Sequence, residues 1–147
     1  REAARERATT PLRVLLAEDN PVNQEVAVRA LERCGHQVVV VDDGAQAVRA
    51  VSEQAPFDLV LMDLQMPVMD GTEATRAIRE RERETGKHLR IIALTANVMA
   101  GDREACLDAG TDDYLAKPLK LPELEAVLQR AIEERAARWD TLQTSAA

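Results

Sequence analysis

The feature that most constrains the fold of this chain is a short apolar run, residues 57–67, which contains a lone aspartate, Asp63, and leads into the turn residues 69–71. The run is too short for a core helix, and its composition is typical of a strand buried on both faces of a sheet. Such strands belong to open parallel sheets, whose carboxyl ends form the crevice in which ligands bind. Asp63 ends the strand, so we expect it at a site of chemistry.

Three other strand-like runs also end in polar or charged residues: 12–17 in Glu18 and Asp19, 90–94 in Thr95, and 113–116 in Lys117. The carboxyl ends of parallel strands lie along one edge of the sheet. The pattern therefore predicts that these side chains converge on Asp63.

Strand-like and helix-like segments alternate along the whole chain. Strands are expected over 12–17, 38–41, 57–63, 90–94 and 113–116, and helices over 22–34, 45–54, 72–84 and 98–109. A final helix begins at 121, and the phase of Trp139 with its apolar stripe indicates that it continues past Ala137. This alternation predicts an α/β fold with a parallel sheet covered on both sides, and right-handed crossovers leave few topologies. We favour a doubly wound five-stranded sheet in the order 2-1-3-4-5, the flavodoxin-like arrangement, which places Glu18 and Asp19 beside Asp63.

Helix-end signals support these boundaries. Asn20 and Pro21 suit an N-cap and a first helical turn, and Gly35 and Gly86 suit helix ends. The first helix is expected to bury one face and to leave only Val28 out of phase; that face comprises Val22, Val26, Ala27, Ala30, Leu31 and Cys34.

The length of 147 residues suits one domain, expected over 12–138 between a linker at 1–11 and a tail at 139–147. The chain starts at Arg1 instead of Met, so we expect a segment excised from a longer protein. Its longest apolar runs are strand-sized, so no membrane contact by this domain is expected.

Composition excludes several functional classes. A net charge of -7 and only three aromatic residues argue against a nucleic-acid surface. Cys34 and Cys106 lack redox or zinc spacing, and we expect both to be reduced and partly buried in a cytoplasmic protein. His36 and His88 are isolated and are expected to be exposed or structural.

The converging residues predict phosphoryl-transfer chemistry. Three carboxylates at contact repel by roughly 4 kcal/mol per pair at an effective dielectric of about 20, so they need a cation. An all-oxygen site that leaves room for water and phosphate suits Mg²⁺. Lys117 adds a mobile positive charge and Thr95 a hydroxyl donor, while Asp63, standing alone after its strand, is the expected nucleophile.

Each of these residues also has a simpler interpretation. Glu18 and Asp19 could cap a helix together with Asn20, Lys117 could be a surface lysine, and Thr95 could be an ordinary polar residue. Short motifs produce many false matches when taken singly. Here, however, each of four separate strand ends carries a group that phosphoryl transfer requires. This combination favours the phosphoryl-transfer site over the simpler interpretations.

Residues 12–132 resemble the receiver domain of two-component signalling, the response-regulator family. The segments that carry the resemblance are 15–20 for the acidic pair, 61–71 for the phosphoacceptor, 93–96 for the switch hydroxyl, and Lys117-Pro118 for the lysine and cis-proline. Every hallmark of the family is present in order.

The resemblance implies that Asp63 accepts a phosphoryl group from a phosphohistidine on a histidine kinase or a histidine phosphotransfer domain. Mg²⁺ would be held by Glu18, Asp19, Asp63 and the backbone carbonyl of Gln65. Thr95 and Tyr114 would be the switch residues that change a partner-binding face. Gln65 and Asn97 match positions that tune the lifetime of the phosphoryl group.

Segments 20–24, 93–97 and 110–114 look most like receivers fused to hybrid sensor histidine kinases. That resemblance implies a domain that catalyses its own phosphorylation and dephosphorylation, which leaves its classification as an enzyme open. It implies a cytoplasmic location, free or as the cytoplasmic part of a membrane-anchored sensor. The sequence leaves open whether the domain also forms a homodimer.

Several alternatives are weighed against this interpretation. A stand-alone response regulator would carry the same site residues, and a binding-only degenerate receiver would usually lack one of them. An aspartate-based phosphatase needs a second acid two residues after its nucleophile, where this chain has Gln65. A dinucleotide-binding protein needs a glycine-rich turn after the first strand, and residues 18–21 contain no glycine.

Overall fold

The computed structural model describes residues 11–54, 56–96 and 100–146, without the side chains of 100–102 and 138–146. In this part of the chain five strands alternate with five helices. The strands are β1 (Arg13–Ala17), β2 (Gln37–Val41), β3 (Leu59–Asp63), β4 (Arg90–Thr95) and β5 (Asp113–Ala116). The helices are α2 (Pro21–Arg33), α3 (Gly44–Glu53), α4 (Gly71–Thr85), α5 (Ala100–Ala109) and α6 (Leu121–Ala146).

All strands are parallel, and their order is β2-β1-β3-β4-β5, so the predicted fold class and strand order are confirmed. Ala17 of β1 is in register with Met62 of β3. The next residue of each strand therefore comes to the same place at the sheet edge, and these residues are Glu18 and Asp63.

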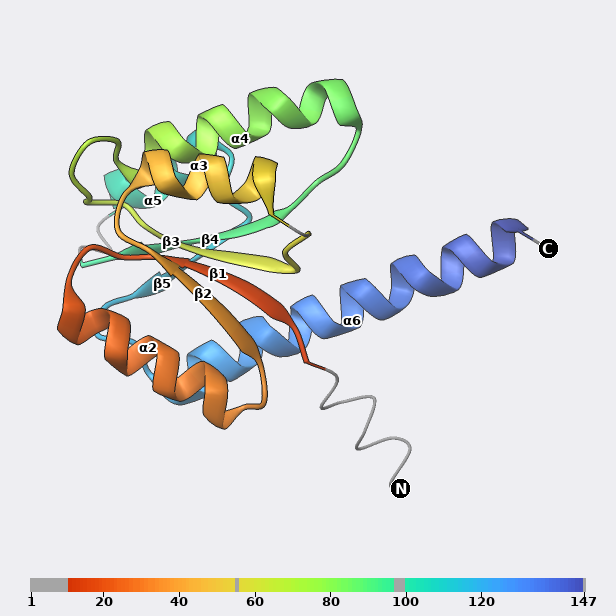
Figure 1. Cartoon of the computed structure of the whole chain (residues 1–147), viewed down its shortest axis with the longest axis horizontal. Helices are drawn as coiled ribbons and strands as arrows, with labels where there is room; N and C mark the ends of the chain where they lie inside the picture. The colour runs from red at the N-terminus through yellow and green to blue at the C-terminus, as the bar shows by residue number, and fades with distance from the viewer. Residues whose placement is uncertain (1–10, 55, 97–99, 147) are drawn as a thin grey trace.

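The sheet is covered on both faces. Helices α2 and α6 pack on one face, and α3, α4 and α5 on the other (Figure 1). Side chains alternate between the two layers, so Leu16 and Leu61 face α2 and α6, whereas Leu15 and Val60 face α3 and α4. All five residues of β3 are buried. Burying each such aliphatic side chain stabilises the fold by roughly 1.5–3 kcal/mol, which makes β3 a rigid support for Asp63.

The predicted helix ends are confirmed. The Asn20 side chain accepts hydrogen bonds from the backbone N–H groups of Val22 and Asn23, and Pro21 occupies the first turn of α2. Gly86 ends α4 in the left-handed conformation, with φ of 72°. These caps satisfy backbone groups that a helix cannot satisfy internally.

The predicted buried face of α2 is wrong at Val22 and Val26, which are 68% and 51% exposed. Val28, predicted to be out of phase, is partly buried and packs on the core with Ala27 and Leu31. At about 100° per residue, a face centred between Ala27 and Leu31 leaves Val28 about 80° from the centre and Val26 about 120°. The apolar pattern alone did not reveal where that centre lies.

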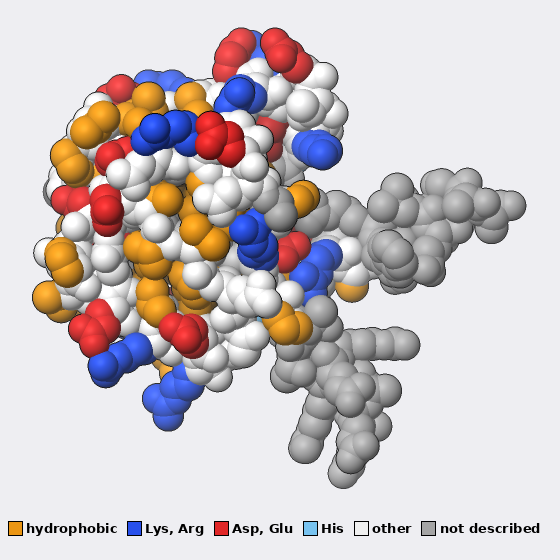
Figure 2. Space-filling model, viewed as in Figure 1, with side chains coloured by type: hydrophobic (Ala, Val, Ile, Leu, Met, Phe, Trp, Pro, Cys, Tyr) orange, Lys and Arg blue, Asp and Glu red, His pale blue; other side chains and the backbone are white. Residues whose placement is uncertain are grey.

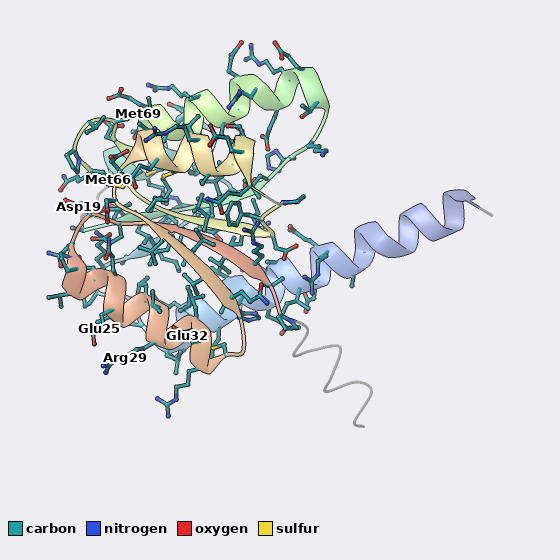
Figure 3. The ribbon with its side chains drawn as sticks, viewed as in Figure 1. Asp19, Glu25, Arg29, Glu32, Met66 and Met69 are labelled. Carbon is teal, nitrogen blue, oxygen red and sulfur yellow. The ribbon has the colours of Figure 1, made fainter. Side chains whose placement is uncertain are left out.

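The outer side of α2 is charged. Arg29 pairs with Glu25 at 2.6 Å, and both side chains are exposed. Figure 3 labels these two residues and Glu32 on the side of α2 that faces away from the sheet.

The edge strand β2 leaves some apolar surface exposed. Figure 2 shows hydrophobic side chains over the middle of the same view, where β2 lies. Val40 of this strand is 38% exposed.

Helix α6 continues past Ala137, as its apolar stripe indicates. The tail expected over 139–147 is wrong for most of its length, because the helix runs through Ala146, and Figure 1 shows its C-terminal part projecting beyond the sheet. Within the described residues, no helix combines the length and the apolar character that spanning a membrane requires.

Arg79 of α4 fastens the turn between α5 and β5. Its guanidinium donates to the carbonyl of Gly110 at 2.8 Å and to that of Leu89 at 2.7 Å. It also pairs with Asp112 at 2.8 Å and with Glu82 at 2.6 Å. The side chain of Arg79 is only 16% exposed, so its hydrogen bonds are charge-assisted and shielded from water. The C-terminal end of α5 is thereby anchored to α4.

His36 is structural, in agreement with the sequence analysis. It is buried, and its Nδ1 accepts a hydrogen bond of 3.0 Å from the backbone N–H of Leu12. That bond requires an unprotonated Nδ1. Burial lowers the pKa of His36 below its usual value, the charge of Arg135 lowers it further, and Asp58 opposes the shift.

We predict that protonation of His36 destabilises the fold in acid. Because its folded pKa is depressed, the unfolded chain binds the proton more readily, so stability is complete above about pH 6.5 and falls as the pH drops below it. His36→Asn, which keeps an acceptor for Leu12 without titrating, should lose less stability between pH 7.5 and 5.5 in urea unfolding. Gln129→Asn, which changes an exposed amide on α6 without adding or removing a titratable group, is the control and should follow the wild type. Equal losses in His36→Asn and wild type would contradict the prediction.

Candidate functional site

Glu18 follows β1 at the carboxyl edge of the sheet and is 1% exposed. One carboxylate oxygen, Oε2, lies 2.8 Å from Nζ of Lys117. The other, Oε1, accepts hydrogen bonds from the side chain of Asn23 at 3.0 Å and from the backbone N–H of Asn20 at 3.3 Å. Both oxygens of this buried acid are therefore held by donors.

Asp63 ends β3 and is 4% exposed. Its Oδ2 lies 3.0 Å from Nζ of Lys117, and its Oδ1 accepts a hydrogen bond of 3.2 Å from the backbone N–H of Gln65. Gly71 packs directly behind it, because a Cβ at that position would lie 2.1 Å from the carbonyl oxygen of Asp63. Only glycine permits this close approach of α4 to the end of β3.

The loop between β3 and α4 is bent sharply. The N–H of Met69 donates to the carbonyl of Pro67 at 2.7 Å, and Val68 between them has φ of 67°. Such a φ is strained for a β-branched residue, and Val68 is 84% exposed. The backbone N–H of Gly44 holds the loop from the other side, through the carbonyl of Met69 at 2.9 Å. Figure 3 shows Met66 and Met69 of this loop on the same side of the molecule as Asp19.

The predicted convergence of the strand ends is confirmed. A cavity of about 700 Å³ lies at this edge, and its lining includes Glu18, Asp19, Asp63, Gln65, Thr95 and Lys117. Oxygen atoms of Glu18, Asp19 and Asp63 lie within 4.8 Å of one another. Asp19 is exposed, so this all-oxygen cluster is open to water on one side. Its donor set and open side fit Mg²⁺, which keeps several waters when bound to proteins.

Electrostatics distinguishes the two buried acids. Burial raises the pKa of Asp63 to about 6, and the neighbouring Glu18 adds to this shift while Lys117 opposes it. Burial also acts to raise the pKa of Glu18, but hydrogen bonds from Lys117 and Asn23 outweigh it, and its pKa is lowered. The two acids lie in contact and therefore titrate as a pair. Lys117 has a raised pKa because both acids hold its charge against the effect of burial.

The two switch residues expected from the resemblance, Thr95 and Tyr114, lie on different strands. Thr95 is 6% exposed and lines the cavity from the end of β4. Tyr114 is half-buried on β5, and the guanidinium carbon of Arg103 lies 5.4 Å from the centre of its ring. The bond between Lys117 and Pro118 is cis. Asn97, expected to tune the phosphoryl lifetime, lies outside the described residues.

The cysteines contribute no ligand pair to the site. Neither forms a disulfide; Cys34 is half-buried, and Cys106 is fully buried and lines the cavity. The expectation of partial burial therefore holds for Cys34 and is wrong for Cys106, which is 1% exposed on the inner side of α5.

The contribution of Asn23 to the site was not predicted from the sequence. Residues 20–24 carried only a resemblance, whereas the structure shows Asn23 in direct contact with Glu18. A usable signal was present, because side chains in a helix tilt toward its N-terminus. A polar residue in the first turn after a strand end therefore points back toward that strand end.

The comparisons agree with this geometry. The profile of the response regulator receiver domain matches residues 14–129, and the chain belongs to that family. It is 47% identical over 117 residues to the sensor histidine kinase GacS of Pseudomonas protegens, an alignment that covers 79% of this chain. The chain spans only 13% of the length of that kinase.

Two solved structures are similar to this chain. One is the receiver domain of sensor histidine kinase PA1611 from Pseudomonas aeruginosa PAO1, with a magnesium ion in its active site cleft. It has 52% identity and a TM-score of 0.76, and the match covers 84% of this chain and 99% of that one. The other is the receiver domain of Ssk1 from Saccharomyces cerevisiae, in complex with the histidine phosphotransfer protein Ypd1. There the identity is 34% and the TM-score 0.73, with coverage of 78% and 83%.

We predict that Asp63→Asn stabilises the metal-free protein. Since the folded pKa of Asp63 is raised, its contribution is present below the unfolded pKa and is lost as the pH rises through about 6. At pH 7.5 in EDTA, the substitution should raise the free energy of unfolding by roughly 1–3 kcal/mol, measured by urea denaturation. Glu53→Gln, at an exposed position on α3, is the control. A less stable Asp63→Asn would contradict the charge balance described above.

Proposed function

We propose that this domain is the phosphoacceptor of a two-component phosphorelay and that Asp63 receives the phosphoryl group. The observation that carries the proposal is the placement of Asp63, which is buried at an open cavity and shares the ammonium of Lys117 with the acid Glu18. A nucleophile, a metal-binding acid pair and a charge-neutralising lysine are the components that phosphoryl transfer requires.

The proposed reaction transfers a phosphoryl group from a partner phosphohistidine to a carboxylate oxygen of Asp63. The new bond joins that oxygen to phosphorus, and the bond between phosphorus and the imidazole nitrogen breaks. Glu18, Asp19, Asp63 and the carbonyl of Gln65 would hold Mg²⁺, which supplies charge neutralisation for the phosphoryl oxygens. The ammonium of Lys117 attracts the same oxygens, and the hydroxyl of Thr95 donates to one of them.

The proposed output is a change in a partner-binding surface. Thr95 moves toward the phosphoryl group, and Tyr114 turns inward behind it. In this proposal Gln65 and Asn97 set how long the phosphoryl group persists.

The proposed partner is a histidine kinase or a histidine phosphotransfer domain, and the similarity to the Ssk1 receiver supports it. The similarity to the sensor histidine kinase GacS supports an origin in a histidine kinase. We propose that this kinase is a hybrid kinase and that the domain works on the cytoplasmic side of a membrane. In that setting 12–138 is the receiver domain, with 1–11 as linker. We also propose that the domain associates with a second copy of itself. Sedimentation with and without phosphorylation would detect this association.

We predict that acetyl phosphate adds one phosphoryl group to the wild-type protein when Mg²⁺ is present. Intact mass spectrometry should detect this gain, and it should disappear in EDTA and in Asp63→Asn. Asp70→Asn is a matched control, because Asp70 is an aspartate of the same loop that caps α4.

A gain that persists in Asp63→Asn would place the acceptor elsewhere. No gain in well-folded wild type calls for a second trial with a phosphorylated histidine phosphotransfer domain. Failure in that trial as well would favour a binding-only receiver.

We predict that Mg²⁺ raises the melting temperature of the wild type. An ion that binds only the folded state stabilises it by RT ln(1 + [L]/Kd), about 2.7 kcal/mol at a concentration of 100 Kd. Asp19→Asn removes one of the three carboxylates and should reduce the shift, whereas Asp70→Asn should retain it. A wild-type melting curve that does not respond to Mg²⁺ would contradict the metal site.

A further inference from the structure

The first turn of α2 is connected to Glu18 through three separate residues. The backbone N–H of Asn20 and the side chain of Asn23 both donate to Oε1 of Glu18. Gln24 reaches the backbone of the same acid, since its Nε2 donates to the carbonyl of Glu18 at 2.5 Å. The same Nε2 donates to Asp42 at 2.8 Å, which connects this turn to the loop before α3.

Asn23 is the side chain in this turn that holds the carboxylate itself. Its Nδ2 lies 3.0 Å from Oε1, and Lys117 holds Oε2 at 2.8 Å from the other side. Rotation of the Glu18 carboxylate would break one of these two contacts. Asn23 therefore opposes any turn of Glu18 toward Lys117 alone and away from the cluster with Asp19 and Asp63.

This contact is not needed to build the helix. Asn20 already caps α2 by accepting from the N–H groups of Val22 and Asn23. Asn23 is exposed, so burial of its side chain adds little to the core. The geometry that its amide constrains is that of the acid, and donors of this kind orient metal ligands and determine affinity.

We propose that Asn23 is a positioning residue for the Mg²⁺ site: its amide fixes the Glu18 carboxylate in the orientation that binds the ion. The inference rests on the proposed function, because it assigns Glu18 to the metal. It adds a residue of α2 to a site otherwise built from strand ends and the loop after β3.

The test compares Mg²⁺ binding and metal-free stability in wild type, Asn23→Leu, Asn23→Gln and Gln129→Leu. Isothermal titration with MgCl2 gives the affinity, and urea unfolding in EDTA gives the stability. Gln129 is an exposed amide on α6 and provides a matched control. We expect Asn23→Leu to raise the Kd for Mg²⁺ about tenfold or more, as for other partners of metal ligands. Asn23→Gln, which keeps the amide on a longer arm, should fall between Asn23→Leu and wild type.

Metal-free stability separates positioning from a merely structural role. We expect Asn23→Leu to unfold at a somewhat lower urea concentration than wild type in EDTA, because the buried Glu18 loses one of its donors. The same variant should also lose Mg²⁺ affinity. The phosphorylation rate with acetyl phosphate should shift its Mg²⁺ dependence to about tenfold higher concentration in Asn23→Leu. A Kd within twofold of wild type would overturn the inference, as would a loss of metal-free stability without a change in Kd. Wild type that neither binds Mg²⁺ nor gains a phosphoryl group would instead overturn the proposed function.

Discussion

One ammonium group balances two buried carboxylates in this domain. Lys117 lies within 3.0 Å of both Glu18 and Asp63, so these two buried carboxylates keep an excess negative charge between them. That charge is tolerated because the strands beneath it are buried on both faces and cannot move apart without exposing apolar surface. The site depends on the strand order of the parallel sheet, because β1 must lie beside β3 for the two acids to come together.

Much of the fold could be predicted because its signals are local. Asn20, Pro21 and Gly86 mark helix ends through backbone geometry that depends on few neighbours. The site was predictable for a related reason: in a parallel sheet each strand end lies at the same edge, so Asp63, Thr95 and Lys117 had to approach one another. No long-range contact was needed to infer that.

The remaining features depend on contacts between segments. Val22 and Val26 fit an apolar stripe, yet the position at which α2 rests on the sheet is set by Ala27 and Leu31 and by the partners they meet. The hydrogen bond from Asn23 to Glu18 depends on one rotamer of each residue. The network of Arg79 joins three segments that are distant in sequence, and residue types alone do not specify its pairings.

The anchor at Arg79 determines how a displacement spreads along α5. This helix has 10 residues and is therefore about 15 Å long, and its C-terminal end is held at Gly110. A body fixed at one end rotates as a lever, so a shift of about 1 Å at the first turn of α5 corresponds to a rotation of about 4° for that length. The displacement decreases steadily toward Gly110. A surface formed by the first turn of α5 would therefore move most in such a rotation, and one formed by its last turn would move least.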